Sequence, residues 1–265
     1  MNGNAYQDWG ASVPHGVGAH YYQDCGSTNI VAAEYARTKC ASPIWIVAGS
    51  QSGGKGRKGR KWLSKEGNLY ASLMFRPSIQ PKDLAALPFI VALAVRDSLV
   101  KLGLPDADVQ CKWPNDILIK GQKVCGILIE SSARSAVALD YVIIGIGINL
   151  LDSPDDAVFP ATSVRETLGQ IISPRSALEA LSSSIKRRLD GWSISDFEPT
   201  RQEWTKHAWG LGEVRRINTA TEAFNAALIR LDEQGGLVAR LENDEQRVIV
   251  AADIFPVTAQ NNEET

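Results

Sequence analysis

The chain has 265 residues, 44% of them hydrophobic, and its 28 Lys and Arg residues against 30 Asp and Glu residues give a net charge of −2. This length and apolar content allow one large domain and a smaller one. The balanced charge argues against a dedicated nucleic-acid-binding domain, which usually carries a broad basic face. No apolar run approaches the roughly 18 residues that predict a transmembrane helix, so we expect no contact with a membrane.

The cysteines and histidines lack the spacing of a metal site. None of the four cysteines forms a Cys-x-x-Cys pair, and the three histidines are scattered along the chain. We therefore expect reduced thiols and no zinc site. The first residues also lack the basic segment and apolar core of a secretory signal peptide. Together these observations predict a cytoplasmic protein.

In chain order, the first predicted elements lead to a glycine-rich loop. Residues 1–18 are polar and contain glycine, and we expect them to form a flexible arm. A short strand at 20–22 precedes a helix that the Ser-Thr-Asn run at 27–29 caps and that continues to about Thr38. The apolar run at 43–48 then predicts a buried strand.

Residues 51–62, called the basic loop below, combine glycine with positive charge. Five of the seven residues at 55–61 are Lys or Arg, and four glycines interrupt the loop. Glycine permits positive φ and a close approach to a ligand, while Arg and Lys bind phosphate or carboxylate. The loop matches neither the P-loop nor the dinucleotide-binding pattern. It predicts an anion-binding loop, although a solvated basic linker or a nucleic-acid patch would have the same composition.

The middle of the chain predicts a long helix and then a sheet. Apolar residues recur at helical period from 81 to 102. Residues 109–113 predict a strand, 116–130 predict a β-hairpin that turns at 120–123, and 141–149 predict another buried strand. We therefore expect an α+β fold in which helices flank a mixed β-sheet.

The last part of the chain predicts a small second domain. A helix begins at Ser173 and Pro174, with Ser as N-cap and Pro at the first helical position. The tryptophan-containing stretch at 192–209 predicts a helical turn or two, and short strands with polar turns follow, as in a small β-barrel. The expected parts are a flexible arm, a large domain, a barrel and a disordered tail, at 1–18, 19–210, 211–258 and 259–265.

Four separated segments contain residues suited to chemistry, but each has an ordinary explanation when taken singly. The run at 27–29 is most simply a helix cap, and the Gly-x-Gly at 145–147 is most simply close strand packing. Lys123, in a hairpin turn, would usually be solvated. The Lys-Trp-Pro-Asn-Asp run at 112–116 is less common, because proline is restricted within strands and a buried Trp needs a partner for its N–H.

In this order and at these spacings the segments resemble the biotin–protein ligases. The family's loop, Gly-Arg-Gly-Arg-x-Gly-Arg, matches residues 54–60 with one exchange, and its Lys-Trp-Pro-Asn-Asp signature is intact at 112–116. Its Lys-x-x-Gly-Ile-Leu motif is found at 123–128 and its Gly-x-Gly-x-Asn motif at 145–149. The resemblance extends over about residues 20–255, including the small C-terminal domain.

This resemblance implies a two-step activity. Biotin and ATP would form biotinyl-5′-AMP with release of pyrophosphate, assisted by Mg²⁺, and biotin would pass to a lysine of the biotin carrier domain of acetyl-CoA carboxylase or a related carboxylase. The implied fold is a mixed-sheet catalytic domain followed by an SH3-like β-barrel. Too few residues precede residue 20 for the DNA-binding domain of some relatives, so we expect the type without it. The sequence leaves monomer and homodimer open.

The resemblance also implies roles for individual residues. Thr28 and Gln51 would bond the ureido ring of biotin, Trp113 would line its apolar slot, and Trp62 would stack on adenine. The expected catalytic residues are Lys123, Arg57 and Asp116. The expected biotin-binding residues are Ser27, Thr28, Asn29, Gln51, Gly54, Lys55, Trp113, Lys123 and Gly126. The expected ATP or adenylate-binding residues are Lys55, Arg57, Arg60, Trp62, Asn115, Lys123 and Asn149. Mg²⁺ would be bound through the ATP phosphates, with protein ligands unassigned.

One departure and two alternatives accompany this interpretation. Lys55 replaces the first loop arginine of the family, which keeps the charge but loses the bidentate fork of a guanidinium group. A lipoate–protein ligase or lipoyl transferase would share the fold and the chemistry, but that family lacks so dense a basic loop and the motif at 112–116. A non-catalytic nucleic-acid-binding protein would use the loop as a basic patch, with strongly salt-dependent affinity.

Overall fold

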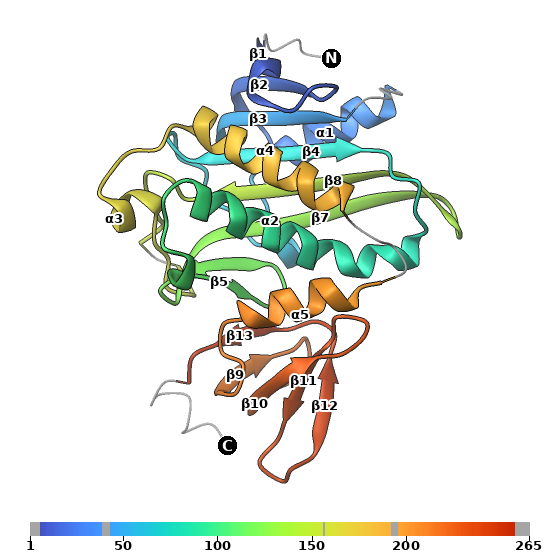
Figure 1. Cartoon of the computed structure of the whole chain (residues 1–265), viewed down its shortest axis with the longest axis vertical. Helices are drawn as coiled ribbons and strands as arrows, with labels where there is room; N and C mark the ends of the chain where they lie inside the picture. Colours follow the sequence, from blue (N-terminus) through green and yellow to red (C-terminus); the bar gives the residue numbers. More distant parts are fainter. Residues whose placement is uncertain (1–5, 39–42, 156, 192–195, 258–265) are drawn as a thin grey trace.

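The computed structural model describes residues 6–38, 43–155, 157–191 and 196–257. Its larger sheet has eight strands in the order β1-β2-β3-β4-β8-β7-β6-β5, and β2 and β3 are its one recorded parallel pair among the described residues. This confirms the predicted α+β fold with a mixed sheet (Figure 1). Its strands are β1 (Gln7–Asp8), β2 (Gly18–Cys25), β3 (Ile44–Gln51), β4 (Leu69–Phe75), β5 (Val109–Lys112), β6 (Asp116–Ile119), β7 (Gln122–Ser135) and β8 (Ala138–Ile148).

Helices cover both faces of this sheet because its central strands are apolar on both sides. Along β3, Trp45 and Val47 belong to the larger core, which includes α2 (Leu87–Lys101) and α4 (Pro174–Asp190). The alternate residue Ile46 belongs to a smaller core with α1 (Thr28–Arg37), as the two-residue period of a strand requires. Figure 1 shows α2 and α4 side by side in front of the sheet.

The ends of the helices follow from local chemistry, except at α1, where the expected cap is not formed. Ser173 caps α4 as predicted, because its Oγ accepts the backbone N–H of Ser176 at 3.1 Å. The helix predicted at 81–102 is a short 3₁₀ helix, Pro81–Ala86, followed by α2. Ser27 occupies the N-cap position of α1, but its side chain makes no capping hydrogen bond.

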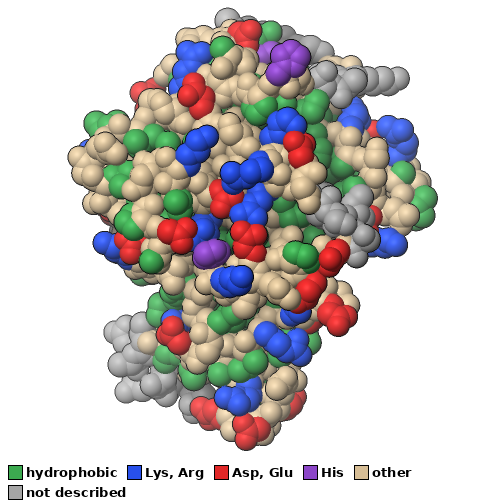
Figure 2. Space-filling view, viewed as in Figure 1, with side chains coloured by type: hydrophobic (Ala, Val, Ile, Leu, Met, Phe, Trp, Pro, Cys, Tyr) green, Lys and Arg blue, Asp and Glu red, His purple; other side chains and the backbone are tan. Residues whose placement is uncertain are grey.

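A salt-bridge network joins three helices. The Arg188 guanidinium of α4 donates to Asp97 of α2 and, through two hydrogen bonds of 2.6 and 2.7 Å, to Glu203 of α5 (Glu198–Lys206). Bidentate geometry of this kind is the strong form of a surface ion pair. On the face shown in Figure 2, basic and acidic side chains are interspersed throughout. The remaining short helix is α3 (Val164–Leu168). No helix within the described ranges is long and apolar enough to span a membrane.

Residues 6–18, the described part of the flexible arm expected at 1–18, lie against the edge of the larger sheet. Among the residues that the structure describes, β1 pairs with β2 and forms the edge of the larger sheet, and the Trp9 ring stacks on Tyr21 with 4.3 Å between centroids. Tyr6 stacks on His20 at 3.6 Å. The aromatic side chains of residues 6–9 cover this edge of the sheet, a contribution that the overall polarity of the segment concealed.

A second, antiparallel sheet follows α5, below the first in Figure 1. Its strand order is β12-β11-β10-β9-β13. Within the described residues the outer strands β12 and β13 are not paired, so the closed SH3-like barrel expected from the sequence is not confirmed. Its strands are β9 (Val214–Asn218), β10 (Ala223–Leu231), β11 (Leu237–Arg240), β12 (Gln246–Ile249) and β13 (Asp253–Phe255).

The turn between β10 and β11 fixes the second sheet against the first. The carbonyl of Gly235 in this turn accepts the indole N–H of Trp113 at 3.1 Å. Gly235 has φ +83° and lies against the Phe89 ring, where an added Cβ would be 2.5 Å from a ring carbon. The Arg201 guanidinium of α5 donates to the Leu231 carbonyl at the end of β10. The turn therefore leaves no space for a side chain at Gly235.

Gly235→Ala tests this junction. Alanine should lose about 1–2 kcal/mol from the left-handed backbone conformation and about 1–3 kcal/mol more from overlap with the Phe89 ring. The matched control is Gly212→Ala, because Gly212 has a similar φ of +81° but open space around its Cβ position. Chemical denaturation should show the larger loss of unfolding free energy for Gly235→Ala; equal losses would contradict the role of the Phe89 contact.

Candidate functional site

A cavity of about 410 Å³ lies where the basic loop, strands β6 to β8 and strand β13 meet. Most of the predicted site residues line it, although they come from distant parts of the sequence. The structure brings together Ser27, Thr28, Asn29, Gln51, Lys55, Arg57, Arg60, Trp62, Asn115, Asp116, Lys123, Gly126 and Asn149. Gly54 and Trp113 are not among the lining residues.

A hydrogen-bond network orders one side of the cavity. The Gln51 side-chain oxygen accepts both the backbone N–H of Thr28, at 2.8 Å, and its hydroxyl, at 3.1 Å. Because a backbone N–H can only donate, this contact fixes the orientation of the Gln51 amide. The Gln51 Nε2 group therefore points to the Ser64 hydroxyl, to which it donates at 3.0 Å.

The network continues through residues that sequence reasoning missed. The Ser72 hydroxyl, fully buried on β4, donates to the Asn29 side-chain oxygen at 2.6 Å, and Asn29 Nδ2 donates to Glu130 at 2.6 Å. Ser72 is a lone polar residue within the apolar run of β4, and a buried hydroxyl requires a partner. That isolation was the one sequence signal of its role.

Glycines on β7 and β8 make room for side chains of the cavity wall. A Cβ at Gly147 would be 2.6 Å from Trp62 Nε1, and a Cβ at Gly126 would be 2.9 Å from the same indole ring. A Cβ at Gly145 would be 2.3 Å from the Asn29 side-chain oxygen. The Gly-x-Gly motif therefore allows Trp62 and Asn29 to lie directly on the sheet. Trp62 Nε1 is buried without a hydrogen-bond partner among the described residues.

A buried carboxylate joins two lysines at the opposite side of the cavity. Asp116 Oδ1 lies 2.6 Å from Lys123 Nζ, and Oδ2 accepts from Lys112 Nζ at 3.2 Å. Burial raises the pKa of the Asp116 carboxyl, but the two ammonium groups outweigh burial and lower the pKa below its ordinary value. Burial lowers the pKa of Lys112, and Asp116 opposes that shift. The sequence interpretation assigned no role to Lys112, which lines the cavity and is 5% exposed.

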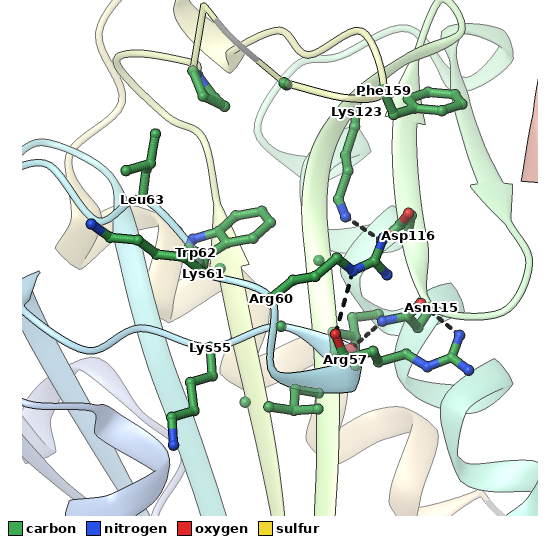
Figure 3. A pocket seen from close by; sticks show the side chains of 18 of the residues that line it. Lys55, Arg57, Arg60, Lys61, Trp62, Leu63, Asn115, Asp116, Lys123 and Phe159 are labelled. Carbon is green, nitrogen blue, oxygen red and sulfur yellow. Dashed lines mark hydrogen bonds and ion pairs between the residues drawn. The ribbon is translucent and has the colours of Figure 1, made fainter. Parts of the chain in front are cut away.

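The basic loop approaches these groups from the other side, as Figure 3 shows. The Arg57 guanidinium donates to the Asn115 side-chain oxygen at 3.4 Å, and Asn115 Nδ2 donates to the Ile127 carbonyl. Burial lowers the pKa of Arg57, while Asp253 and Asp116 counteract that shift. In the view of Figure 3, Lys55 extends away from the Lys123–Asp116 pair, and it has no ion-pair partner among the described residues.

Three predicted residues contribute through the framework of the site. Asn149 is buried at the cavity wall, where its Nδ2 donates to the Thr162 carbonyl at 3.1 Å. Gly54 packs behind the cavity, because a Cβ there would lie 2.7 Å from the Trp62 carbonyl. Trp113, expected in an apolar ligand slot, is instead in the core between the two sheets, with its N–H bonded to Gly235. Its neighbour Lys112 lines the cavity, so Trp113 occupies the other face of this segment.

Comparison with known proteins identifies the family. The chain is 35% identical over 234 residues to the biotin–[acetyl-CoA-carboxylase] ligase of Paracoccus denitrificans, covering 86% of this chain and 96% of that protein. The chain belongs to the biotin–protein ligase family. The profile of the Biotin/lipoate A/B protein ligase family also matches residues 23–149, a range that contains all four motif segments.

Two solved biotin–protein ligases have the same architecture. The Aquifex aeolicus enzyme in complex with biotin and ATP superposes with a TM-score of 0.74 at 26% identity, covering 89% of this chain and 97% of that one. The Leishmania major enzyme in complex with biotinyl-5-AMP superposes with a TM-score of 0.65 at 25% identity, covering 90% and 100%. Both comparisons extend over both sheets of this ligase-family chain.

Gly147→Ala tests the packing of Trp62. A methyl group at Gly147 should displace the indole ring and destabilise the protein by about 1–3 kcal/mol through overpacking. The Trp62 indole N–H resonance, assigned by its loss in Trp62→Phe, should shift in the NMR spectrum of the variant. Gly26→Ala is the control, because Gly26 lies beside the same cavity segment with no atom within 4 Å of its Cβ position. An unshifted resonance in Gly147→Ala would show that the glycine does not seat the ring.

Proposed function

We propose that this chain is a biotin–protein ligase that forms biotinyl-5′-AMP from biotin and ATP and then biotinylates a lysine of a carboxylase biotin carrier domain. The supporting observation is that one cavity contains both an amide and hydroxyl network and, opposite it, two lysines that form ion pairs with Asp116. A substrate with a polar ring at one end and a carboxylate at the other would span these two regions.

The amide and hydroxyl region suits the ureido ring of biotin. That ring offers one carbonyl acceptor and two N–H donors, so it needs donors and acceptors together. Ser27 supplies a hydroxyl that the helix cap does not use, and Thr28 and Gln51 supply hydroxyl and amide groups. Because the Trp62 ring contacts Gly126, we place Trp62 at the boundary between the biotin slot and the adenine site.

The cationic region suits the first chemical step. A carboxylate oxygen of biotin would attack the α-phosphorus of ATP, the bond to the bridging oxygen would break, and pyrophosphate would leave. Both reactants are anions, so the step needs positive charge where they meet. Lys123 would leave Asp116 to bind the carboxylate and α-phosphate, Arg57 would hold the phosphate, and Lys55 would add charge from the basic loop.

Mg²⁺ would reach the site with ATP. Among the described residues no group of three His, Cys, Asp or Glu side chains is arranged to hold a metal ion by itself. We therefore propose that phosphate oxygens and water would supply most of the Mg²⁺ ligands. When bound, Mg²⁺ would neutralise phosphate charge, and the protein groups would still determine where biotin and the α-phosphate meet.

The second step forms an amide. The neutral amine of the acceptor lysine would attack the acyl carbon of biotinyl-5′-AMP, the carbon–oxygen bond to phosphate would break, and AMP would leave while the nitrogen loses a proton. Asp116 is the cavity carboxylate beside Lys123. Its lowered pKa makes it a weak base, so we assign it the orientation of Lys123 and of the incoming amine.

The two alternatives have less support. The matched family profile includes lipoate ligases, but the Paracoccus denitrificans relative, matched over 96% of its length, is named as a biotin ligase. A nucleic-acid-binding protein would present a broad basic surface, whereas the 28 Lys and Arg residues of this chain are balanced by 30 Asp and Glu residues. Arg57 and Arg60 of the basic loop line a cavity that also contains Asp116 and Asp253, which suits a small anionic ligand.

Pyrophosphate–ATP exchange with biotin or lipoate tests the proposed function. Exchange should require biotin, and Lys123→Ala should lower it about a hundredfold to a thousandfold, as expected for removal of a charge-stabilising group. The control is Lys120→Ala, because Lys120 lies in the same hairpin with a side chain that is 66% exposed. Exchange with lipoate alone would assign the sister activity, and no exchange with either acid would refute the proposal.

A further inference from the structure

Strand β13 brings an acidic residue from the second sheet into the cavity. Asp253 and Phe255 both line the cavity wall, although they lie about 190 residues after the basic loop in the sequence. The Phe255 ring lies 6.2 Å from the Phe159 ring, which belongs to the same wall. The C-terminal sheet thus forms part of the site.

Asp253 pairs with two cations of the basic loop. Its Oδ1 accepts from the Arg60 guanidinium at 2.9 Å, and its Oδ2 lies 3.5 Å from Lys58 Nζ. Within the described residues, neither Lys58 nor Arg60 has another acidic partner. The Asp253 carboxylate also acts electrostatically on Arg57 and on the buried Lys112.

The tip of the loop, residues 56–60, needs such an anchor because its backbone bonds are made only within the loop. Lys58 has φ +56° and Gly59 has φ +72°, both in the left-handed region, and glycines at 56 and 59 add freedom. At the base of the loop, the Ser52 and Gly53 N–H groups donate to the Cys25 and Gly26 carbonyls at 3.0 and 2.8 Å. The bonds within the loop are the Gly56 N–H to the Arg60 carbonyl at 2.7 Å, the Arg60 N–H to the Arg57 carbonyl at 3.2 Å, the Trp62 N–H to the Gly54 carbonyl at 2.9 Å, and the bridge between Lys55 and Lys61. The bonds within the loop close it on itself but do not fix its tip, residues 56–60, against the cavity. The contacts that do so at its tip are Asp253 and the 3.4 Å bond from Arg57 to Asn115.

We propose that Asp253 is a positioning residue that ties the tip of the basic loop to the C-terminal sheet. Through Lys58 and Arg60 it holds Arg57 beside Asn115, so that the phosphate-binding group is in place before ATP arrives. The junction at Trp113 and Gly235 holds the sheet itself, which makes that sheet the support of the loop. The tether does not depend on the proposed function, but its consequence for retention of biotinyl-5′-AMP does.

Trypsin reads out the tether directly, because the loop is rich in its cleavage sites. In the full-length protein without ligand, Asp253→Asn should increase the rate of cleavage within residues 55–61 roughly fivefold, the size expected for loss of a partly exposed double ion pair. Mass spectrometry of the fragments locates the cuts. Asp253→Glu keeps the carboxylate and should restore most of the protection.

Glu222→Gln provides the matched control. It removes a carboxylate from the same sheet, where Glu222 pairs with Arg247 at 3.4 Å away from the loop, and it should leave cleavage at the wild-type rate. Equal cleavage of Asp253→Asn, Glu222→Gln and wild type would overturn the proposal. If Asp253→Asn does not fold, Arg60→Gln removes the same contact from the loop side. Cleavage is then compared at the other Lys and Arg residues of 55–61, and a wild-type rate there would also overturn the proposal.

The functional consequence has its own assay. With biotin and ATP but no acceptor, Asp253→Asn should release free biotinyl-5′-AMP faster than wild type, detected as biotinylation of an added bystander protein. Faster proteolysis without faster release would confine the tether to a structural role and overturn its part in retention. Absence of adenylate formation by the wild type would instead refute the proposed function and leave the proteolysis result intact.

Discussion

The site must keep several positive charges close together before any ligand neutralises them. The rest of the site depends on the carboxylates that make this possible. Two like charges about 4 Å apart repel by about 4 kcal/mol at an effective dielectric constant near 20. Asp116 offsets this repulsion between Lys112 and Lys123, and Asp253 does the same between Lys58 and Arg60. Each carboxylate therefore holds two cations close together before a ligand binds.

The two carboxylates differ in burial and so in the role they suit. Asp116 is 8% exposed and belongs to a rigid strand, and removal of a partner from such a buried pair costs about 3–5 kcal/mol. Asp253 has a side chain that is 23% exposed and contacts a loop, so its ion pairs can exchange more readily with phosphate. The ion pairs of Asp116 maintain the shape of the cavity, while those of Asp253 determine the position of the basic loop.

Sequence reasoning predicted the main sheet, its flanking helices and most of the cavity residues, because those depend on local period and on compact motifs. It placed Trp113 in the ligand slot because a motif does not reveal which face of a segment meets the cavity. It missed Glu130 and Asp253 because each acts through a long-range contact, with Asn29 and Arg60 respectively. Stacking of Trp9 on Tyr21 likewise could not be inferred from a polar N-terminal composition.

The most direct test of the charge arrangement is a crystal structure with a stable analogue of biotinyl-5′-AMP. Our account predicts that Lys123 Nζ leaves Asp116 for the phosphate while Lys112 stays paired with Asp116, because a buried anion must keep one partner. Arg57 should contact the same phosphate. A structure in which Lys123 remains on Asp116 and the phosphate is bound by other residues would contradict the account.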